Sequence, residues 1–273
     1  MCRWVAYNGQ RLHMEELVTT PTHSLVEQSM NTRMNHYPDG SLWSMNGDGF
    51  GIGWYAHRNE PGLFKDESPA WSNENLREVC AQIRARIFFA HVRATTTGAV
   101  QRSNCHPFKH KNWMFQHNGD VSDFELIRRD LQMDIAPELY NELKGTTDSE
   151  TFFMLALTYG LEKNPKEALR KMVQRVQKAS ADHNTSAVLN LSCALSDGKR
   201  VYTIRYSDNE KHPKTQFYKI SDPFVNPEGR IPPSRNIVIV SEPLDHTGDN
   251  WVEVPHNSFL TAYKGEVVRE EFM

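Results

Sequence analysis

The sequence predicts an α+β fold in which helices pack against mainly antiparallel sheets. Nine segments combine β-branched and aromatic residues with turn residues at their ends, a pattern typical of strands. They fall into two groups, one before residue 120 and one after residue 185. Helical patterns lie between the two groups, and this order of strands, helices and strands favours helices layered on antiparallel sheets.

The first group contains four expected strands, with one expected helix among them. The helix covers Glu74–Ile83. The strands are expected at Cys2–Tyr7, Gly51–His57, Ile87–Arg93 and Trp113–His117.

The helices in the middle of the chain begin with residues that favour helix starts. Ser122–Gln132 opens with S-D-F-E, Ser149–Leu161 follows T-T-D, and Pro165–Ala181 has a proline in its first turn. The second group of strands is expected at Ala187–Leu195, Arg200–Tyr206, Gln216–Ile220, Asn236–Ser241 and Trp251–Val254. Loop-like stretches cover residues 21–40, 59–73 and 221–235, and no repeat or linker divides the chain, so a single domain is expected over residues 2–273.

Composition excludes several classes of protein. The 273 residues are 38% hydrophobic and 24% charged, with a net charge of −3 and no basic tract, so neither nucleic acid nor a membrane is expected as a partner. No apolar run approaches the roughly 18 residues of a membrane span, and no secretory signal opens the chain, so a cytoplasmic location is expected. The four cysteines lack a C-x-x-C pair, which argues against a disulfide framework or a zinc ribbon.

Arg93 lies where an expected buried strand ends, in H-V-R-A-T-T-T-G (residues 91–98). A guanidinium in this position can bind a substrate carboxylate through two parallel hydrogen bonds. It can equally form an internal ion pair with an Asp or Glu. The segment alone leaves both interpretations open.

Asn118 and Gly119 follow the strand expected at Trp113–His117. Asn-Gly is the commonest pair in tight turns, so the segment alone favours a turn. An Asn amide beside a Gly N–H can also converge on one developing oxyanion.

Asp148 lies in G-T-T-D-S-E (residues 145–150), just before an expected helix. Thr147 or Asp148 could cap that helix, with Glu150 in its first turn. Asp148 could instead face outward and hold a substrate ammonium group.

Two further motifs are interpreted structurally. N-G-D-G-F-G-I-G-W-Y (residues 46–55) lacks the phosphate-loop pattern, and its glycines would let the backbone pass close to the site or to a neighbouring strand. Cys105 and His106 offer two metal ligands, but no third and fourth follow at suitable spacing, so no metal is expected.

In this order, Cys2, R-A-T-T-T-G, N-C-H-P-F, H-N-G-D and T-D-S-E resemble the class II glutamine amidotransferases, whose glutaminase domains are N-terminal nucleophile hydrolases. The motifs G-D-G-F-G-I-G-W-Y and V-S-E-P-L (residues 240–244) resemble the free-standing branch without a synthase domain. That branch includes γ-glutamyl hydrolases of ergothioneine synthesis and glutathione breakdown. The resemblance implies a four-layer αββα sandwich of two mainly antiparallel sheets, and no cofactor is expected.

The resemblance also implies a nucleophile and an oxyanion hole. Cys2 would be the nucleophile after loss of Met1, and Asn118 with the Gly119 N–H would form the oxyanion hole. A free α-amine has a reference pKa near 8, so the amine of Cys2 can take the thiol proton without a separate histidine. The γ-glutamyl thioester formed on sulfur would then be hydrolysed by water.

The resemblance also implies which residues contact the substrate. Arg93 would bind the α-carboxylate of the substrate, Asp148 would bind its α-ammonium group, and Thr96 falls on a site-lining threonine of the family. Thr97 stands where several members have His, which leaves the contacts of this loop open.

Two classes of function follow from these residues. The first is a cysteine amidohydrolase acting on glutamine or a γ-glutamyl conjugate, able to feed ammonia to a separate partner subunit. The second is a non-catalytic amino-acid-binding or regulatory module on the same fold. Retention of Met1 would favour the second, because the nitrogen of Cys2 would then be an amide and could not act as the base.

Overall fold

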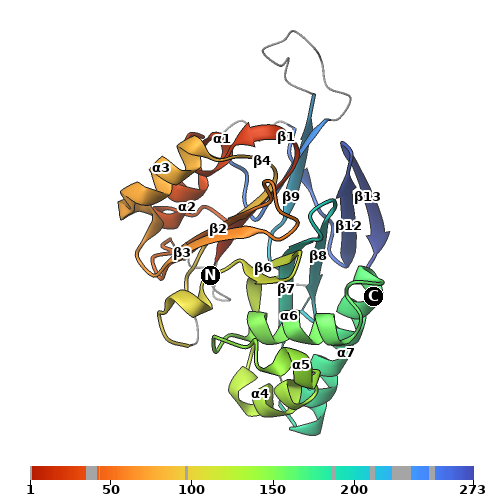
Figure 1. The fold of residues 1–273 in the computed structure, drawn as a ribbon. Coiled ribbons are helices and arrows are strands. Elements are labelled where there is room, and N and C mark those ends of the chain that lie inside the picture. Colours follow the sequence, from red (N-terminus) through yellow and green to blue (C-terminus); the bar gives the residue numbers. More distant parts are fainter. Residues whose placement is uncertain are drawn as a thin grey trace.

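Two antiparallel sheets packed face to face form the centre of the structure (Figure 1). The computed structural model describes residues 2–34, 42, 44–95, 98–185, 188–209, 213–222, 235–245 and 250–273. From edge to edge, the first sheet consists of β11 (Val252–Glu253), β9 (Phe217–Ser221), β10 (Asn236–Val240), β1 (Arg3–His13), β4 (Arg84–Val92), β2 (Phe50–Trp54) and β3 (Gly62–Asp66). The second consists of β13 (Glu266–Glu271), β12 (Ser258–Tyr263), β8 (Val201–Ser207), β7 (Leu189–Ser196), β6 (Trp113–Val121) and β5 (Phe108–His110).

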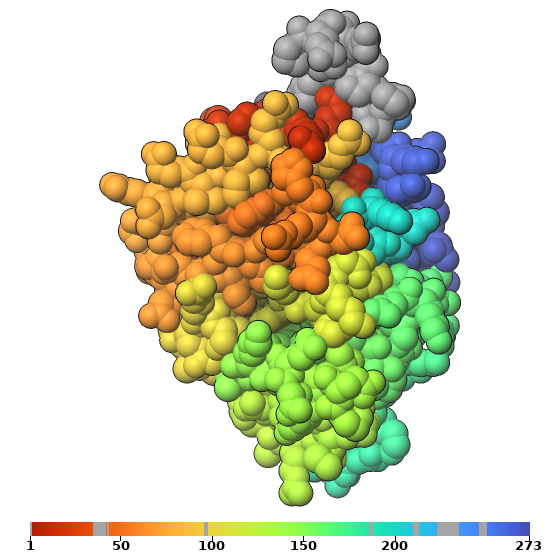
Figure 2. Space-filling view, viewed as in Figure 1, coloured from red at the N-terminus to blue at the C-terminus, as the bar shows by residue number. Residues whose placement is uncertain are grey.

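Helices cover the outer face of each sheet. Three pack on the first sheet against β1 or β4, or against each other: α1 (Glu15–Val18), α2 (Leu25–Met30) and α3 (Glu74–Gln82). Four belong to the second sheet, where α6 contacts β6 and α7 contacts β7: α4 (Phe124–Met133), α5 (Pro137–Tyr140), α6 (Asp148–Thr158) and α7 (Pro165–Asp182). Two 3-10 turns lie at Ala70–Ser72 and Arg102–Asn104. Figure 2 shows one face, with the orange segments of the first sheet above the green helices of the second.

The central strand β1 illustrates how the layers are held together. Trp4 and Ala6 point between the sheets, where they pack with Phe89 and Met114. Val5 and Tyr7 point the other way, into the core beneath α1, α2 and α3. Because successive side chains of a strand face opposite sides, one short segment contributes both to the core between the sheets and to the core beneath the helices.

The structure confirms the expected α+β sandwich with helices outside two antiparallel sheets. Each of the nine expected strands and four expected helices overlaps an observed element. The sequence analysis missed β3, β5, β12, β13, α1, α2 and α5. The missed helices have only four to six residues, too few for a helical period, and the mostly exposed edge strand β13 reads as polar.

Two expectations about strand ends and loops are wrong. β1 continues to His13 instead of ending at Tyr7, with a register shift against β4 between Asn8 and Leu12. The stretches 21–40 and 59–73, expected as loops, contain α2 and β3. No helix in the described part of the chain is long and apolar enough to cross a membrane.

The glycines of residues 46–55 bring backbones close together, as expected. A Cβ at Gly51 would lie 2.0 Å from the His106 carbonyl oxygen, and one at Gly53 would lie 2.6 Å from Met114 Sδ. β2 can therefore pass against the segment before β5 only because these positions lack side chains.

We expect Gly51→Ala to lower the free energy of unfolding by about 2–3 kcal/mol, because backbone atoms must move to admit the methyl group. Gly47→Ala is the matched control, since its Cβ would meet only the partly exposed ring of Trp71 and should cost less than about 1 kcal/mol. Urea denaturation measures both. Equal losses for the two variants would contradict the close approach at Gly51.

Candidate active site

Cys2 precedes β1 at the end of the first sheet where β4 also ends. Arg3 pairs with Val92, the last residue of β4, and the half-buried Cys2 thiol lies 3.6 Å from the Ala94 carbonyl oxygen. Trp4 points between the sheets, and its indole N–H donates to the Ser192 carbonyl oxygen of β7 at 3.0 Å. By the two-residue period of a strand, the Cys2 side chain lies on this same inter-sheet side.

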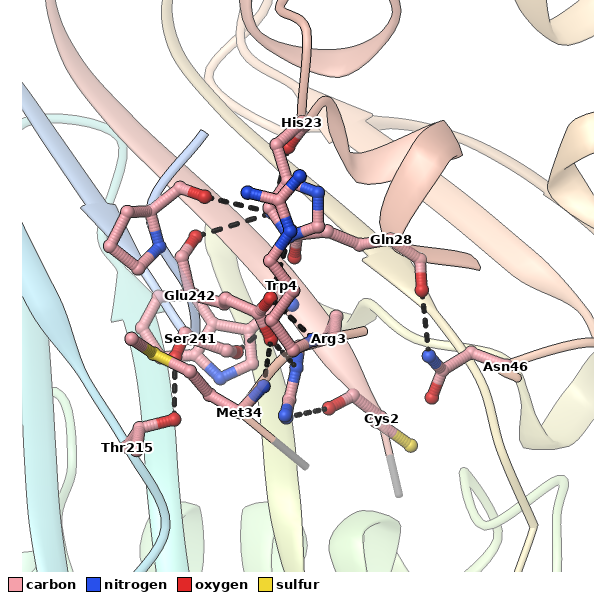
Figure 3. Close-up of polar contacts among 12 residues, drawn as sticks. Cys2, Arg3, Trp4, His23, Gln28, Met34, Asn46, Thr215, Ser241 and Glu242 are labelled. Atoms are coloured by element: carbon pink, nitrogen blue, oxygen red, sulfur yellow. Dashed lines mark hydrogen bonds and ion pairs between the residues drawn. The ribbon is translucent and has the colours of Figure 1, made fainter. Parts of the chain in front are cut away.

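A buried ion pair holds the residue next to Cys2 (Figure 3). Arg3 Nε lies 3.0 Å from Glu242 Oε2, and both side chains are at most 2% exposed. Arg3 Nη1 donates to the Cys2 carbonyl oxygen at 3.0 Å. The guanidinium therefore connects the carboxylate of Glu242 directly to the backbone of Cys2.

The Glu242 carboxylate accepts hydrogen bonds from several other donors. His23 Nε2 lies 2.6 Å from Oε1, and the backbone N–H groups of Arg33 and Met34 donate at 2.8 and 3.1 Å. Burial raises the pKa of Glu242, but the hydrogen bond from His23 and the charge of Arg3 outweigh burial, so that the pKa lies below its usual range. Glu242 thus stays ionised at neutral pH and joins α2 and its following loop to β1.

The sequence analysis missed this cluster. V-S-E-P-L was used only as a marker of the free-standing branch, and Arg3 was not singled out. The available signal was an arginine inside an apolar strand, which requires a buried anion somewhere in the fold. The sequence alone does not reveal that this anion lies 239 residues away.

Arg93 is buried, and no described carboxylate pairs with it. It is 3% exposed, and its guanidinium donates to the Thr95 hydroxyl at 2.9 Å and to the carbonyl oxygens of Asp48 and Ala99 at 3.4 and 3.3 Å. Among the described residues, no Asp or Glu oxygen lies within 4.0 Å of it. An internal ion pair with a described Asp or Glu, one of the two interpretations of Arg93, is therefore excluded.

Asn118 and Gly119 lie within β6 and do not form a turn. Asn118 pairs with Ser192 and Gly119 with Leu191, and the strand runs on to Val121. A Cβ at Gly119 would lie 1.9 Å from the Asn190 carbonyl oxygen, so close approach of the backbone requires glycine here. The expected strand end at His117 and the tight turn after it are both wrong.

The Asn118 side chain is buried, with an exposed fraction of 0%. Neither Oδ1 nor Nδ2 has a hydrogen-bond partner among the described residues. Gln116, two positions earlier, donates across the sandwich to the Val5 carbonyl oxygen at 3.0 Å, so Asn118 also faces the sheet that carries Cys2. An unpaired buried amide costs about 1–3 kcal/mol, which makes it a strong sign of a ligand-binding group.

Asp148 is the first residue of α6, where Thr147 provides the cap. The Thr147 hydroxyl accepts from the Glu150 N–H at 3.2 Å, and the Asp148 carboxylate accepts from the Ser149 N–H at 2.7 Å. Ser149 Oγ also lies 2.9 Å from His117 Nδ1, which places Asp148 beside the part of β6 that carries Asn118. Burial raises the pKa of Asp148, although these hydrogen bonds and the charge of Arg93 oppose the change.

A second carboxylate lies near Asp148. Burial raises the pKa of Asp120, the negative charge of Asp148 adds to this, and the Lys214 ammonium, 4.0 Å away, opposes it. Asp120 was part of the H-N-G-D motif but was given no role from sequence. The two carboxylates together favour a cation between β6 and α6.

Three histidines behind the site are buried and neutral. Burial lowers the pKa of His91 to about 3 and that of His117 to about 4, and it holds the pKa of His106 well below its usual range. His91 and His106 stack with ring centres 4.2 Å apart, and Cys105 Sγ donates to the Asp66 carbonyl oxygen. Within the described ranges, no three His, Cys, Asp or Glu side chains are placed to hold a metal ion.

The structure brings most of the predicted residues to one end of the sandwich. Cys2 lies against the segment of Arg93, and Trp4 links the start of β1 to Ser192, the strand partner of Asn118. Thr96 lies outside the described residues, as does Thr97.

Comparisons with known proteins agree with this arrangement. A family model described as class II glutamine amidotransferases matches residues 14–272. The chain belongs to the class II glutamine amidotransferases. Family membership supports enzymatic activity on glutamine amides, as the ordered motifs had indicated.

Three relatives of this class II glutamine amidotransferase differ in sequence identity and in the share of each chain that the match covers. The probable glutamine amidotransferase DUG3 of Saccharomyces cerevisiae is 33% identical over 303 residues, covering 98% of this chain and 83% of its own. The solved class-II domain protein of Silicibacter pomeroyi is 32% identical with a TM-score of 0.73, covering 99% of both chains. The glutamine phosphoribosylpyrophosphate amidotransferase of Bacillus subtilis shares the fold at 12% identity, with a TM-score of 0.60. This match covers 100% of the present chain and 49% of the Bacillus chain.

We expect Glu242→Gln to lower the free energy of unfolding by about 3–5 kcal/mol, because it leaves the buried Arg3 charge without a counter-ion. The loss should shrink as the pH falls below about 4, since a carboxylate with a depressed folded-state pKa contributes its full stability above its unfolded-state pKa and loses it as the pH falls through the folded-state pKa. Urea denaturation at a series of pH values measures both effects.

Glu253→Gln is the control for this measurement. Glu253 contacts Arg205 at 2.8 Å, but its side chain is 58% exposed, so less than about 1 kcal/mol should be lost. A similar loss for both variants would show that the buried pair is not the anchor of β1.

Proposed function

We propose that this protein hydrolyses the γ-amide of glutamine or of a γ-glutamyl conjugate through a thioester on Cys2. The observation that carries the proposal is the Asn118 amide, which has no hydrogen-bond partner among the described residues and faces the sheet where Cys2 precedes β1. The guanidinium of Arg93, which has no carboxylate partner in the part of the chain that the structure describes, lies on the segment that contacts the Cys2 thiol and supports the proposal. A nucleophile, an oxyanion donor and a carboxylate receptor would then share one end of the sandwich.

The reaction begins with activation of the Cys2 thiol. After removal of Met1, the free α-amine of Cys2 takes the thiol proton, directly or through one water molecule. The described histidines near the site support this assignment, because burial lowers the pKa of His91 and His117 far below neutrality and both rings make backbone contacts. The amine is therefore the better base at neutral pH.

Attack by the thiolate on the amide carbon creates a tetrahedral oxyanion. The Asn118 Nδ2 group and the Gly119 N–H donate to this oxygen. The His117 carbonyl accepts from His91 Nε2 of the opposite sheet, so it points away from β7, and the strand period turns the Gly119 N–H the same way. Donors held in place before the reaction stabilise the charge as it forms.

The remaining steps release ammonia and then glutamate. The protonated α-amine gives its proton to the departing nitrogen as the carbon–nitrogen bond breaks, which leaves a γ-glutamyl thioester. Water, deprotonated by the same amine, then attacks the thioester carbon and releases the thiol and glutamate.

Arg93 and Asp148 position the substrate. The guanidinium of Arg93 binds the α-carboxylate, and the half-buried carboxylate of Asp148, whose pKa is raised by desolvation, would be stabilised by an α-ammonium group. Thr96 would line the same site. Recognition of the amino-acid end fixes the scissile carbonyl relative to sulfur and leaves the amide substituent free to vary.

We also propose that residues 2–273 form one amidotransferase type-2 domain, since the two sheets share a core that includes Trp4 of β1 and Ala262 of β12. Ammonia could pass to a separate partner subunit. The name of the yeast relative, glutamine amidotransferase, supports an ammonia-donating role but does not identify the acceptor.

Cys2→Ala should abolish glutamate release from glutamine and from a panel of γ-glutamyl peptides while changing the free energy of unfolding by less than about 1 kcal/mol. Within the described residues the partly exposed thiol makes a single long hydrogen bond, so little packing is lost. Cys80→Ala, a buried cysteine of α3, is the control that should keep full kcat. Residual turnover by the Cys2 variant would exclude the thioester and favour a different nucleophile.

Asn118→Ala should lower kcat about 100- to 1,000-fold with a small change in KM, because the donor acts on the transition state. Stability should stay equal or rise, since an unpaired buried amide is removed. Asn236→Ala is the matched control: its amide oxygen accepts from Tyr7 and Gln10, so stability should fall while kcat is kept. A stability loss at Asn118 with unchanged kcat would show a structural role.

A further inference from the structure

A cavity opens at the end of the sandwich opposite Cys2. It has a volume of about 300 Å³ and lies between five segments that come from both sheets. Cys2 and Asn8 are separated by six residues of extended strand, or about 20 Å at roughly 3.3 Å per residue. The cavity is therefore separate from the candidate active site. We call it the basic pocket, lined by Asn8, Gly9, Arg11, Tyr55, Ala56, Arg86, Ile87, Gly198, Lys199, Tyr263 and Lys264.

Four of the lining residues are cationic, and none is acidic. Arg11 and Arg86 come from β1 and β4 of the first sheet, while Lys199 and Lys264 come from turns of the second. In the described part of the chain, none of these four side chains has a carboxylate within 4.0 Å. Four positive charges around one pocket repel one another. The chain as a whole carries a net charge of −3, so this excess of positive charge is local to the pocket.

Asp197, the acidic residue of the β7–β8 turn, is already hydrogen-bonded to the backbone of that turn. The Asp197 carboxylate accepts from the N–H groups of Lys199 and Arg200 at 2.8 and 2.7 Å, and it lies 3.9 Å from the Arg200 guanidinium. Within the described ranges, the Lys199 ammonium therefore has no counter-ion. An anion from solution would balance the pocket.

The walls of the basic pocket are held by specific backbone contacts. Asn8 Nδ2 donates to the Lys199 carbonyl oxygen at 3.2 Å, which ties the β7–β8 turn to β1 at its register shift. Gly198 has a φ of +84°, and a Cβ there would lie 3.1 Å from the Tyr55 ring. On the face shown in Figure 2, the cyan β7–β8 turn lies beside the orange segment that follows β2. Irregular strand geometry of this kind often re-aims side chains near binding sites.

Tyr263 adds an aromatic surface beside the cations. Lys264 Nζ lies 5.2 Å from the centre of the Tyr263 ring, and the Arg200 guanidinium lies 4.9 Å from the same ring centre. These contacts are worth about 0.5–1 kcal/mol at exposed sites and hold Lys264 at the pocket edge.

We propose that the basic pocket binds a phosphoanhydride chain, either free polyphosphate or the triphosphate of a nucleotide. Two guanidinium groups suit bidentate contacts to phosphate oxygens, and two ammonium groups add point charges. Four cations match the charge of a triphosphate better than that of a single phosphate. The volume of the pocket lies near the lower limit for small-molecule sites, which suits a chain of linked phosphates.

Calorimetric titration of the full chain with inorganic tripolyphosphate, ATP and orthophosphate tests the proposal. Tripolyphosphate should bind with a Kd in the micromolar range at low salt, at least 10-fold more tightly than orthophosphate, and binding should weaken as salt rises. Tighter binding of ATP than of tripolyphosphate would assign the site to a nucleotide, whereas equal binding would assign it to the phosphate chain alone.

The double variant Arg86→Gln/Lys264→Gln should weaken tripolyphosphate binding at least 10-fold. Arg170→Gln/Lys178→Gln is the control, because it removes the same charge from α7, where both side chains already pair with acids. Equal binding by the two variants, or no binding to the unaltered protein at about 1 mM ligand, would overturn the proposal. Glutaminase activity should be the same in both variants, so this result does not depend on the function proposed for Cys2.

Discussion

The buried ion pair between Arg3 and Glu242 is the contact on which the candidate site depends. It joins the first residue of β1 to the segment after β10, and through His23 and two backbone N–H groups it also holds α2 and its following loop. Burial of both charges is costly, but their attraction and the additional hydrogen bonds offset that cost. The hydrogen bond from Arg3 to the Cys2 carbonyl fixes the direction in which the chain enters the sheet. The position of the thiol is therefore set by charges that lie on the far side of β1 from the reaction.

The site also contains groups whose local contacts leave them energetically unsatisfied. Among the described residues, the Asn118 amide has no hydrogen-bond partner and the buried charge of Arg93 has no carboxylate beside it. Both arrangements lower stability unless a ligand completes them, because desolvated polar groups lose their bonds to water. A carboxylate at Arg93 and an oxyanion at Asn118 are what an amino-acid amide would supply. The structure thus keeps, within one rigid sandwich, the two kinds of donor that the proposed reaction uses.

Much of the fold could be predicted because it depends on local patterns. The apolar strands Ile87–Arg93 and Ala187–Leu195 and the amphipathic helix Pro165–Ala181 each carry enough residues to show a period. The turn expected at Asn118 was wrong because a strand pair and a close backbone contact at Gly119 override the local Asn-Gly preference. Glu242 could not be assigned because its partner lies 239 residues away. Residue types that were costly in a structural role pointed to the candidate site, whereas the contacts that hold those residues in place required the three-dimensional fold.

The central claim is that a free N-terminal Cys2 carries a γ-glutamyl thioester. The most direct measurement is the intact mass of the protein from its own host, taken before and shortly after mixing with a slowly turned-over γ-glutamyl substrate, followed by peptide mapping. The account predicts a species that lacks Met1 and gains one γ-glutamyl group on the peptide that begins with Cys2. A protein that retains Met1, or that releases glutamate without any acyl group on Cys2, would contradict it.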